Sequence, residues 1–329
     1  MHYQLNFVLF WMKLLILEGP KFGYYPAPEK SYLVVDATYF NEANELFSPF
    51  GVSIVEGFRV LGGFVGSKRE GDIWVSSKVD VWVQSLNILS EVAKMQPQAA
   101  YVAVSKSLQN EWSYLQRIHP DCDELFNHLR TALINNFIPS LIGNPITEIE
   151  FQIFEKPTRM AGLGIRDPVI NSIQAFNTSF ESTKILSKSI STGNAVDIDS
   201  YETTLIEVSK QMKKERETHN FNQTMEIIQR LPQDKSNKLK RIAENKCSTW
   251  LSIYPTNDNF FAMSPNEFRD ALAIRYHIRP KGLPAICDGC GEDFTMNHAL
   301  NCKKGGLVTA RHNEARDLNC DLCALAGLS

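Results

Sequence analysis

The sequence predicts an α-dominant α+β fold, and two observations support this prediction. Apolar residues recur at helical spacing through most of the chain, for example at Trp74, Val79 and Leu86. Short runs of β-branched and aromatic residues gather between residues 32 and 66, bounded by Gly and Pro. A small β region near the start should therefore be followed by a long series of helices.

Length and composition are those of a globular protein. With 329 residues, the chain can form two or three compact units. Apolar residues make up 43% and charged residues 22%, and the formal net charge is −3. That charge argues weakly against nucleic-acid binding, because proteins with this function are usually basic. Residues 210–246, however, hold ten Lys/Arg against five Asp/Glu, which fits either a solvated helix face or an arm that contacts phosphates.

The first element should be a helix over residues 5–18 that ends at Gly19-Pro20. Its apolar composition resembles a signal peptide, but no Lys or Arg precedes the apolar run, and Lys13 interrupts it. The run is also too short to span a bilayer. We therefore predict a buried helix that packs against the β region through the side chains of Phe7, Trp11, Leu14 and Leu15.

The β region should consist of a strand at 32–36 and a hairpin formed by 52–55 and 58–61, with its turn near Glu56-Gly57. Three helices are expected next, at 72–95, 99–116 and 122–137. Residues 145–166 are rich in Pro and Gly and predict a loop. A helix at 171–189, a polar linker near 189–200 and a charged helical segment at 205–246, broken by Pro232, complete the middle of the chain.

The strongest chemical signal is the pattern C-x2-C-x7-H-x3-C formed by Cys287, Cys290, His298 and Cys302. Three thiolates and one imidazole are a ligand set typical of structural Zn²⁺. Gly289 and Gly291 should allow the tight turn that brings the first two cysteines together. A short helix from about Thr295, ended by Gly305-Gly306, would carry His298 and Cys302 on one face.

Two alternatives to this ligand set remain open. The cysteines could be buried free thiols beside a surface histidine, although the segment is polar and offers little core. In a rival zinc site, a second C-x2-C formed by Cys320 and Cys323 would replace His298 and Cys302. Both zinc sites need reduced thiols and so predict an intracellular protein, nuclear or cytoplasmic.

Several stretches, in this order, resemble the C-terminal part of reverse transcriptases of non-LTR retroelements. They are residues 19–35, 58–66, 78–82, 97–101, 159–165, 268–275, the cysteine–histidine segment and 311–317. The resemblance implies a palm remnant with a primer-grip-like hairpin over 1–66 and a helical thumb over 67–145. It further implies a helical connection over 146–246, and over 247–329 a zinc knuckle followed by the start of a nuclease-like helix.

The resemblance also implies which catalytic parts are missing. Polymerases of this family hold two Mg²⁺ ions with clustered carboxylates that include an Asp-Asp pair, and this sequence contains no Asp-Asp. That hairpin would precede Met1, and Asp36 does not occupy a catalytic position. We therefore expect no polymerase activity from this chain alone. Glu314 could be the first acid of a nuclease-like site, or part of an ordinary polar helix face with His312 and Asp317.

The function implied by the resemblance is sequence-tolerant binding of RNA or DNA, with no membrane partner. The candidate phosphate contacts are cations of the thumb and of the charged segment: Lys68, Arg69, Lys78, Arg117, Lys213, Lys214, Lys238 and Arg241. One alternative is a domesticated zinc-binding protein-interaction module. Another is a truncated gene model of an active reverse transcriptase and endonuclease, in which only the complete parent enzyme would need Mg²⁺.

Overall fold

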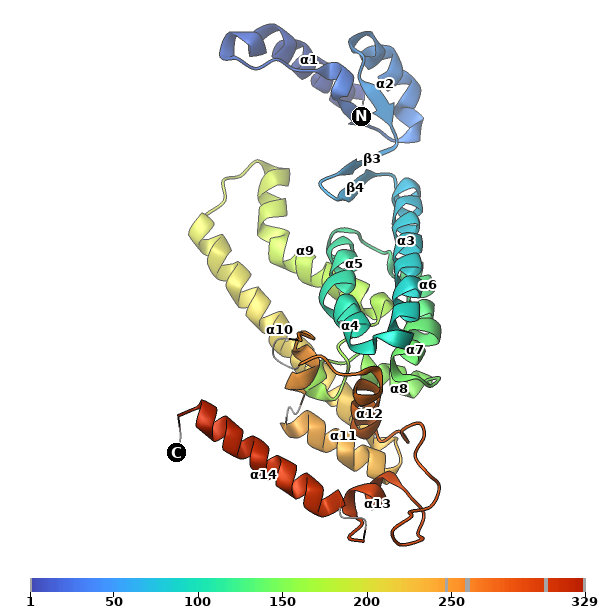
Figure 1. Ribbon diagram of the computed structural model, residues 1–329. Coiled ribbons are helices and arrows are strands. Elements are labelled where there is room, and N and C mark those ends of the chain that lie inside the picture. Colours follow the sequence, from blue (N-terminus) through green and yellow to red (C-terminus); the bar gives the residue numbers. More distant parts are fainter. Residues whose placement is uncertain (1, 246–247, 258–260, 305–306, 328–329) are drawn as a thin grey trace. The chain divides into compact units, whose positions relative to one another are not determined.

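The computed structural model of the chain describes residues 2–245, 248–257, 261–304 and 307–327 (Figure 1). Helices dominate these residues and the strands contain three or four residues each, which confirms the predicted α-dominant α+β class. Two compact units emerge. Unit 1 comprises 1–87, 106–133 and 166–215, and unit 2 comprises 88–105, 134–165 and 216–329. Each unit is built from three separate segments of the chain. The four consecutive regions that the resemblance implies are not tested by this division and stay a prediction.

The start of unit 1 is a small α/β layer. Helix α1 (His2–Glu18) and helix α2 (Phe40–Phe47) accompany strands β1 (Tyr32–Val34) and β2 (Ser53–Val55). The strands pair in parallel, with Leu33 opposite Ile54. Their core consists of the buried residues Leu5, Val35, Ala43, Phe47 and Val52. Asp36, two residues after β1, caps the short 3-10 helix Ala37–Tyr39: its carboxylate accepts a hydrogen bond from the Thr38 backbone N–H, which lowers the pKa of Asp36.

The predicted packing face of α1 is wrong. Phe7 is 60% exposed and Trp11 48% exposed, whereas Leu5 is buried and Leu9 and Met12 pack against the core. The physical reason is that α1 is apolar on all sides. Spacing alone therefore identifies the helix but cannot select the face that it buries.

The predicted hairpin is also wrong in its pairing. Strand β3 (Gly57–Val60) pairs antiparallel with strand β4 (Gly63–Gly66), while β2 pairs with β1. The turn lies at Leu61-Gly62, whose φ angles of 49° and 80° are both left-handed. Two positive φ values match the twist of a tight hairpin, and Gly supplies one of them at little cost. The Tyr114 hydroxyl donates to the Leu61 carbonyl at 2.9 Å and holds this turn.

Unit 1 continues as a group of helices with an aromatic core. Helix α3 (Lys68–Met95) begins in this unit, which also contains α5 (Gln109–Ile118), α6 (Asn127–Ala132) and α9 (Pro168–Thr192). The Trp82 ring packs edge-on against Trp112, with centroids 6.1 Å apart, and stacks on Phe126 at 6.4 Å. Trp112 and Phe126 are fully buried, so these rings fix how α3 and α5 meet.

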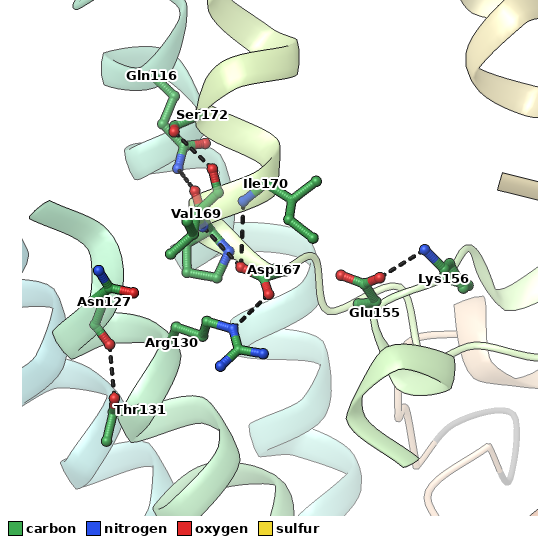
Figure 2. A network of polar contacts seen from close by, with 11 residues as sticks. Gln116, Asn127, Arg130, Thr131, Glu155, Lys156, Asp167, Val169, Ile170 and Ser172 are labelled. Carbon is green, nitrogen blue, oxygen red and sulfur yellow. Dashed lines mark hydrogen bonds and ion pairs between the residues drawn. The ribbon is translucent and has the colours of Figure 1, made fainter. Parts of the chain in front are cut away.

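Polar contacts at the start of α9 join this helix to two neighbouring helices, and Asp167 makes the contact with α6 (Figure 2). Its carboxylate caps α9 by accepting from the backbone N–H groups of Val169 and Ile170, and it receives a hydrogen bond from Arg130 Nε of α6 at 2.7 Å. Gln116 of α5 donates to the Pro168 carbonyl at 2.7 Å. Asp167 is 4% exposed, so its charge depends on these partners.

Helices and loops make up most of the described part of unit 2, with one isolated β-bridge between Ile286 and Asp293. This unit holds α4 (Pro97–Val102), α7 (Ile138–Ile142), α8 (Glu148–Phe154), α11 (Gln233–Asn245), α12 (Pro265–Tyr276), α13 (Met296–Asn301) and α14 (Leu307–Leu325). Helix α10 (Ile198–Gln229) runs through both units. The predicted loop at 145–166 was wrong where α8 forms, because a Thr147–Glu150 capping box starts a helix there. The linker is shorter than predicted, since α9 ends at Thr192 and α10 begins at Ile198.

The Gly-Leu-Gly-Ile element is a buried scaffold in unit 2. A Cβ atom on Gly162 would lie 1.8 Å from the Lys156 carbonyl oxygen, so only glycine fits. The Tyr101 hydroxyl donates to the Leu163 carbonyl at 2.7 Å, and Arg275 of α12 donates to the Gly162 carbonyl at 3.3 Å. This turn therefore docks against α4 and α12 through its backbone.

Glu150 predicts a pH dependence of stability. Burial raises the pKa of Glu150, but hydrogen bonds from Lys235 and Thr147 outweigh it and hold the pKa below the ordinary value of 4.5. A depressed carboxyl pKa adds stability above the unfolded-state value, and this stability is lost as pH falls through the folded-state value. The difference in unfolding free energy between the wild type and Glu150→Gln should therefore be largest at neutral pH and shrink below 4.5. Urea unfolding at several pH values measures it, and a constant difference would contradict the prediction.

Candidate metal centre

The four predicted ligands converge in unit 2. Their ligand atoms all lie within 4.8 Å of one another. Cys287 Sγ is 3.8 Å from Cys302 Sγ, Cys302 Sγ is 3.9 Å from Cys290 Sγ, and Cys290 Sγ is 3.1 Å from His298 Nε2. Sulfur atoms about 2.3 Å from a tetrahedral ion lie roughly 3.8 Å apart, so the two Sγ–Sγ separations match a tetrahedral site. The cluster could hold a metal ion.

A short hairpin presents Cys287 and Cys290. Cys287 donates its backbone N–H to the Glu292 carbonyl, and Gly291 donates back to the Cys287 carbonyl, both at 2.8 Å. Ile286 and Asp293 form an antiparallel bridge beside them. Gly291 has a φ of 77°, which makes it the residue that needs glycine's freedom. Gly289 was expected to share this role, but it is not among the described residues with positive φ.

Helix α13 presents the other two ligands. The Thr295 side chain caps it by accepting from the His298 N–H at 3.1 Å, as the predicted start near Thr295 requires. The helix ends at Asn301, earlier than expected, and Cys302 leaves it in an extended conformation while donating to the His298 carbonyl at 2.7 Å. The predicted terminator Gly305-Gly306 lies outside the described residues.

The surroundings of His298 and Cys287 favour metal binding, whereas those of Cys290 do not. His298 Nδ1 lies 3.3 Å from Glu292 Oε2, while Nε2 faces Cys290. A carboxylate that accepts from one ring nitrogen leaves the other free as a metal ligand. A hydrogen bond with His298 is the largest of the causes that lower the pKa of Cys287 to about 7, which favours the thiolate that binds metals. The Glu292 backbone lowers the pKa of Cys290, but burial and the neighbouring thiols raise it overall.

The rival ligand set is not assembled in the described residues. The group that could hold a metal contains Cys287, Cys290, His298 and Cys302, and neither Cys320 nor Cys323 belongs to it. Both of those cysteines are exposed on α14. Glu314, the nuclease-like candidate, is exposed on the same helix. Among the described residues, Glu314 belongs to no group of three or more His, Cys, Asp or Glu side chains that could hold a metal ion.

The eight candidate phosphate contacts lie in different environments. Lys68 pairs with Asp72 at 3.3 Å, and the Arg117 guanidinium lies over the Tyr114 ring. Lys238 is half-buried with its Nζ 3.9 Å from Met296 Sδ, and desolvation lowers the pKa of Lys238. Of the other five, Lys78 is half-buried and the exposed ones are Arg69, Lys213, Lys214 and Arg241. Unit 1 contains all but Lys238 and Arg241, which share unit 2 with the metal cluster.

Two polar residues around the cluster were missed in the sequence. Glu292 follows Cys290 by two positions, and an acid so close to a cysteine ligand was an available signal. Arg279 lies eight residues before Cys287 and donates to backbone carbonyls on both arms of the ligand loop. Its position in the sequence does not predict this role, because its acceptors are backbone carbonyls, which do not depend on residue type.

No family model, curated protein or solved structure matches the chain. Among the described helices, none is long and apolar enough to cross a membrane. The chemistry of the cysteine–histidine cluster is therefore the main evidence on function.

Proposed function

We propose that the chain binds one structural Zn²⁺ ion through Cys287, Cys290, His298 and Cys302. The convergence of these four ligand atoms is the observation that carries the proposal. Thiolate and imidazole ligands in a tetrahedral arrangement suit Zn²⁺ better than Mg²⁺ or Ca²⁺, which prefer oxygen. Four protein ligands also leave no open position for water or substrate, so the ion would stabilise the fold rather than catalyse a reaction.

We further propose that the chain is a retroelement reverse-transcriptase fragment whose remaining role is to bind RNA or DNA. Its support is the resemblance of the ordered motifs to the palm end, thumb and knuckle of that family. Exposed cations on α10 add to it: Lys213 and Lys214 project from a helix whose neighbouring residues are largely exposed. Contacts from such side chains would go to phosphates, so binding would be sensitive to salt and tolerant of sequence.

Salt dependence tests this role. The double variant Lys213→Ala/Lys214→Ala should weaken binding to a labelled RNA–DNA duplex and reduce the slope of log affinity against log salt by about 2, because each phosphate contact contributes about 0.9. Fluorescence anisotropy at several salt concentrations measures both quantities. Lys184→Ala/Lys188→Ala on α9 removes the same charge elsewhere and is the matched control. A wild-type chain that shows no salt-dependent binding would refute the role.

A zinc-binding protein-interaction module is the second candidate. Helix α1 favours it, because Phe7, Phe10, Trp11 and Leu17 are all exposed by 48% or more. An apolar surface of this kind on one helix is typical of protein contacts. Absence of nucleic-acid binding by a zinc-loaded chain would favour this candidate.

A further inference from the structure

Arg279 connects the two arms of the metal-ligand loop. It lies just beyond α12, which ends at Tyr276 and is followed by the left-handed residue His277. Its Nη2 donates to the Pro284 carbonyl at 2.8 Å and to the Leu283 carbonyl at 3.3 Å. Its Nη1 donates to the Phe294 carbonyl at 3.1 Å. Leu283 and Pro284 form the arm that precedes Cys287. Phe294 lies on the other arm, after Cys290.

The Phe294 end of this contact leads directly to a ligand. The Phe294 ring packs edge-on against the His298 ring, with centroids 6.0 Å apart. Phe294 also donates its N–H to the Ala285 carbonyl at 2.8 Å, which closes the hairpin. Arg279 therefore holds the backbone of Phe294. This residue closes the hairpin that carries Cys287 and Cys290, and its ring supports the ring of His298.

The loop needs such support because it has little core of its own. In the described part of residues 283–304, the buried side chains are Cys287, Met296 and Cys302, and two of these are ligands. A loop with so little apolar burial is ordered mainly by the metal and by hydrogen bonds. A planar guanidinium has its donors in a fixed fork, so it can hold several carbonyls in one geometry, which a lysine ammonium cannot do.

We infer that Arg279 is a positioning residue of the metal centre. It holds the two arms of the ligand loop together before the ion arrives, and this preorganisation raises the affinity for Zn²⁺ because less ordering remains for the metal to impose. The effect on metal affinity rests on the proposed zinc site. The ordering of the metal-free loop does not depend on it.

Arg279→Ala should lower zinc affinity in the full chain by about tenfold, the lower end for residues that support metal ligands, because Arg279 is exposed to solvent. Competition with a chelator of known affinity measures the change. Stoichiometry should stay at one ion per chain, and Co²⁺ at saturation should keep a tetrahedral thiolate spectrum. Arg279→Lys should restore less than half of the loss in the logarithm of zinc affinity. Lys281→Ala, an exposed cation two residues away, should leave affinity unchanged.

Hydrogen exchange of the metal-free chain separates the two proposals. Arg279→Ala should speed exchange at the amides of Cys287 and Phe294, whereas Lys281→Ala should not. Unchanged exchange, or zinc affinity within twofold of the wild type, would overturn the role of Arg279. A wild-type chain that fails to bind zinc would refute the proposed metal site. In that case, faster exchange in Arg279→Ala would still show that this residue orders the loop.

Discussion

Cys290→Ser should abolish stoichiometric zinc binding and disorder residues 285–302. Cys290 Sγ lies 3.1 Å from His298 Nε2 and 3.9 Å from Cys302 Sγ, so its loss leaves three ligands and an open position. Structural zinc in small domains contributes about 10–16 kcal/mol of binding free energy at pH 7, and most of that is folding free energy. Metal analysis after gel filtration gives the stoichiometry, and hydrogen exchange at Glu292 and Cys302 reports the local order.

Cys320→Ser/Cys323→Ser is the matched control, because it removes two thiols outside the cluster. This variant should keep one ion per chain and wild-type protection in the loop. Loss of zinc from Cys320→Ser/Cys323→Ser would contradict the ligand assignment, and so would zinc that survives in Cys290→Ser.

Asp167→Ala should lower the free energy of unfolding by about 3 kcal/mol. The change removes a helix cap, worth about 1 kcal/mol, and a charge-assisted hydrogen bond, worth about 1.5–3 kcal/mol. The lost hydrogen bond is the 2.7 Å contact from Arg130 Nε, whose side chain is 29% exposed, so water can partly solvate the unpaired guanidinium. Urea unfolding followed by tryptophan fluorescence measures the loss, because Trp82 and Trp112 lie in the same unit.

Two controls separate the contributions of Asp167. Asp167→Asn keeps a side-chain acceptor for the Val169 N–H but loses the charge opposite Arg130, so it should cost less than Asp167→Ala. Asp197→Ala removes a hydrogen bond at the exposed start of α10 and should cost under about 1 kcal/mol. An Asp167→Ala chain no less stable than Asp197→Ala would show that the buried network contributes little.

The helices were predictable because their signal is local. The spacing of Trp74, Val79 and Leu86 marks α3 without knowledge of any partner, and Pro232 correctly separates α10 from α11. Strand pairing depends on distant contacts. Nothing within residues 52–61 shows that β2 pairs with β1 rather than with β3, and the Leu61-Gly62 turn lacks the usual Asn or Asp. In α1, uniform hydrophobicity conceals which face is buried.

The candidate metal cluster was predictable for the same reason. The spacing of its side chains, together with the Thr295 cap, is contained within sixteen residues. The contacts that support the cluster could not be predicted from local spacing. Arg279 acts on backbone carbonyls, and the choice of Gly291 over Gly289 as the left-handed residue depends on how the hairpin closes. Local patterns therefore identified the four residues of the cluster, while the three-dimensional closure of the loop decides which residues support them.

X-ray absorption at the zinc edge of the full chain would test the proposed metal centre directly. Coordination through Cys287, Cys290, His298 and Cys302 predicts three sulfur atoms at about 2.3 Å and one imidazole nitrogen at about 2.0–2.1 Å. The rival set with Cys320 and Cys323 would give four sulfur atoms and no imidazole. A four-sulfur shell, or a shell that includes oxygen, would contradict the closed Cys3His site.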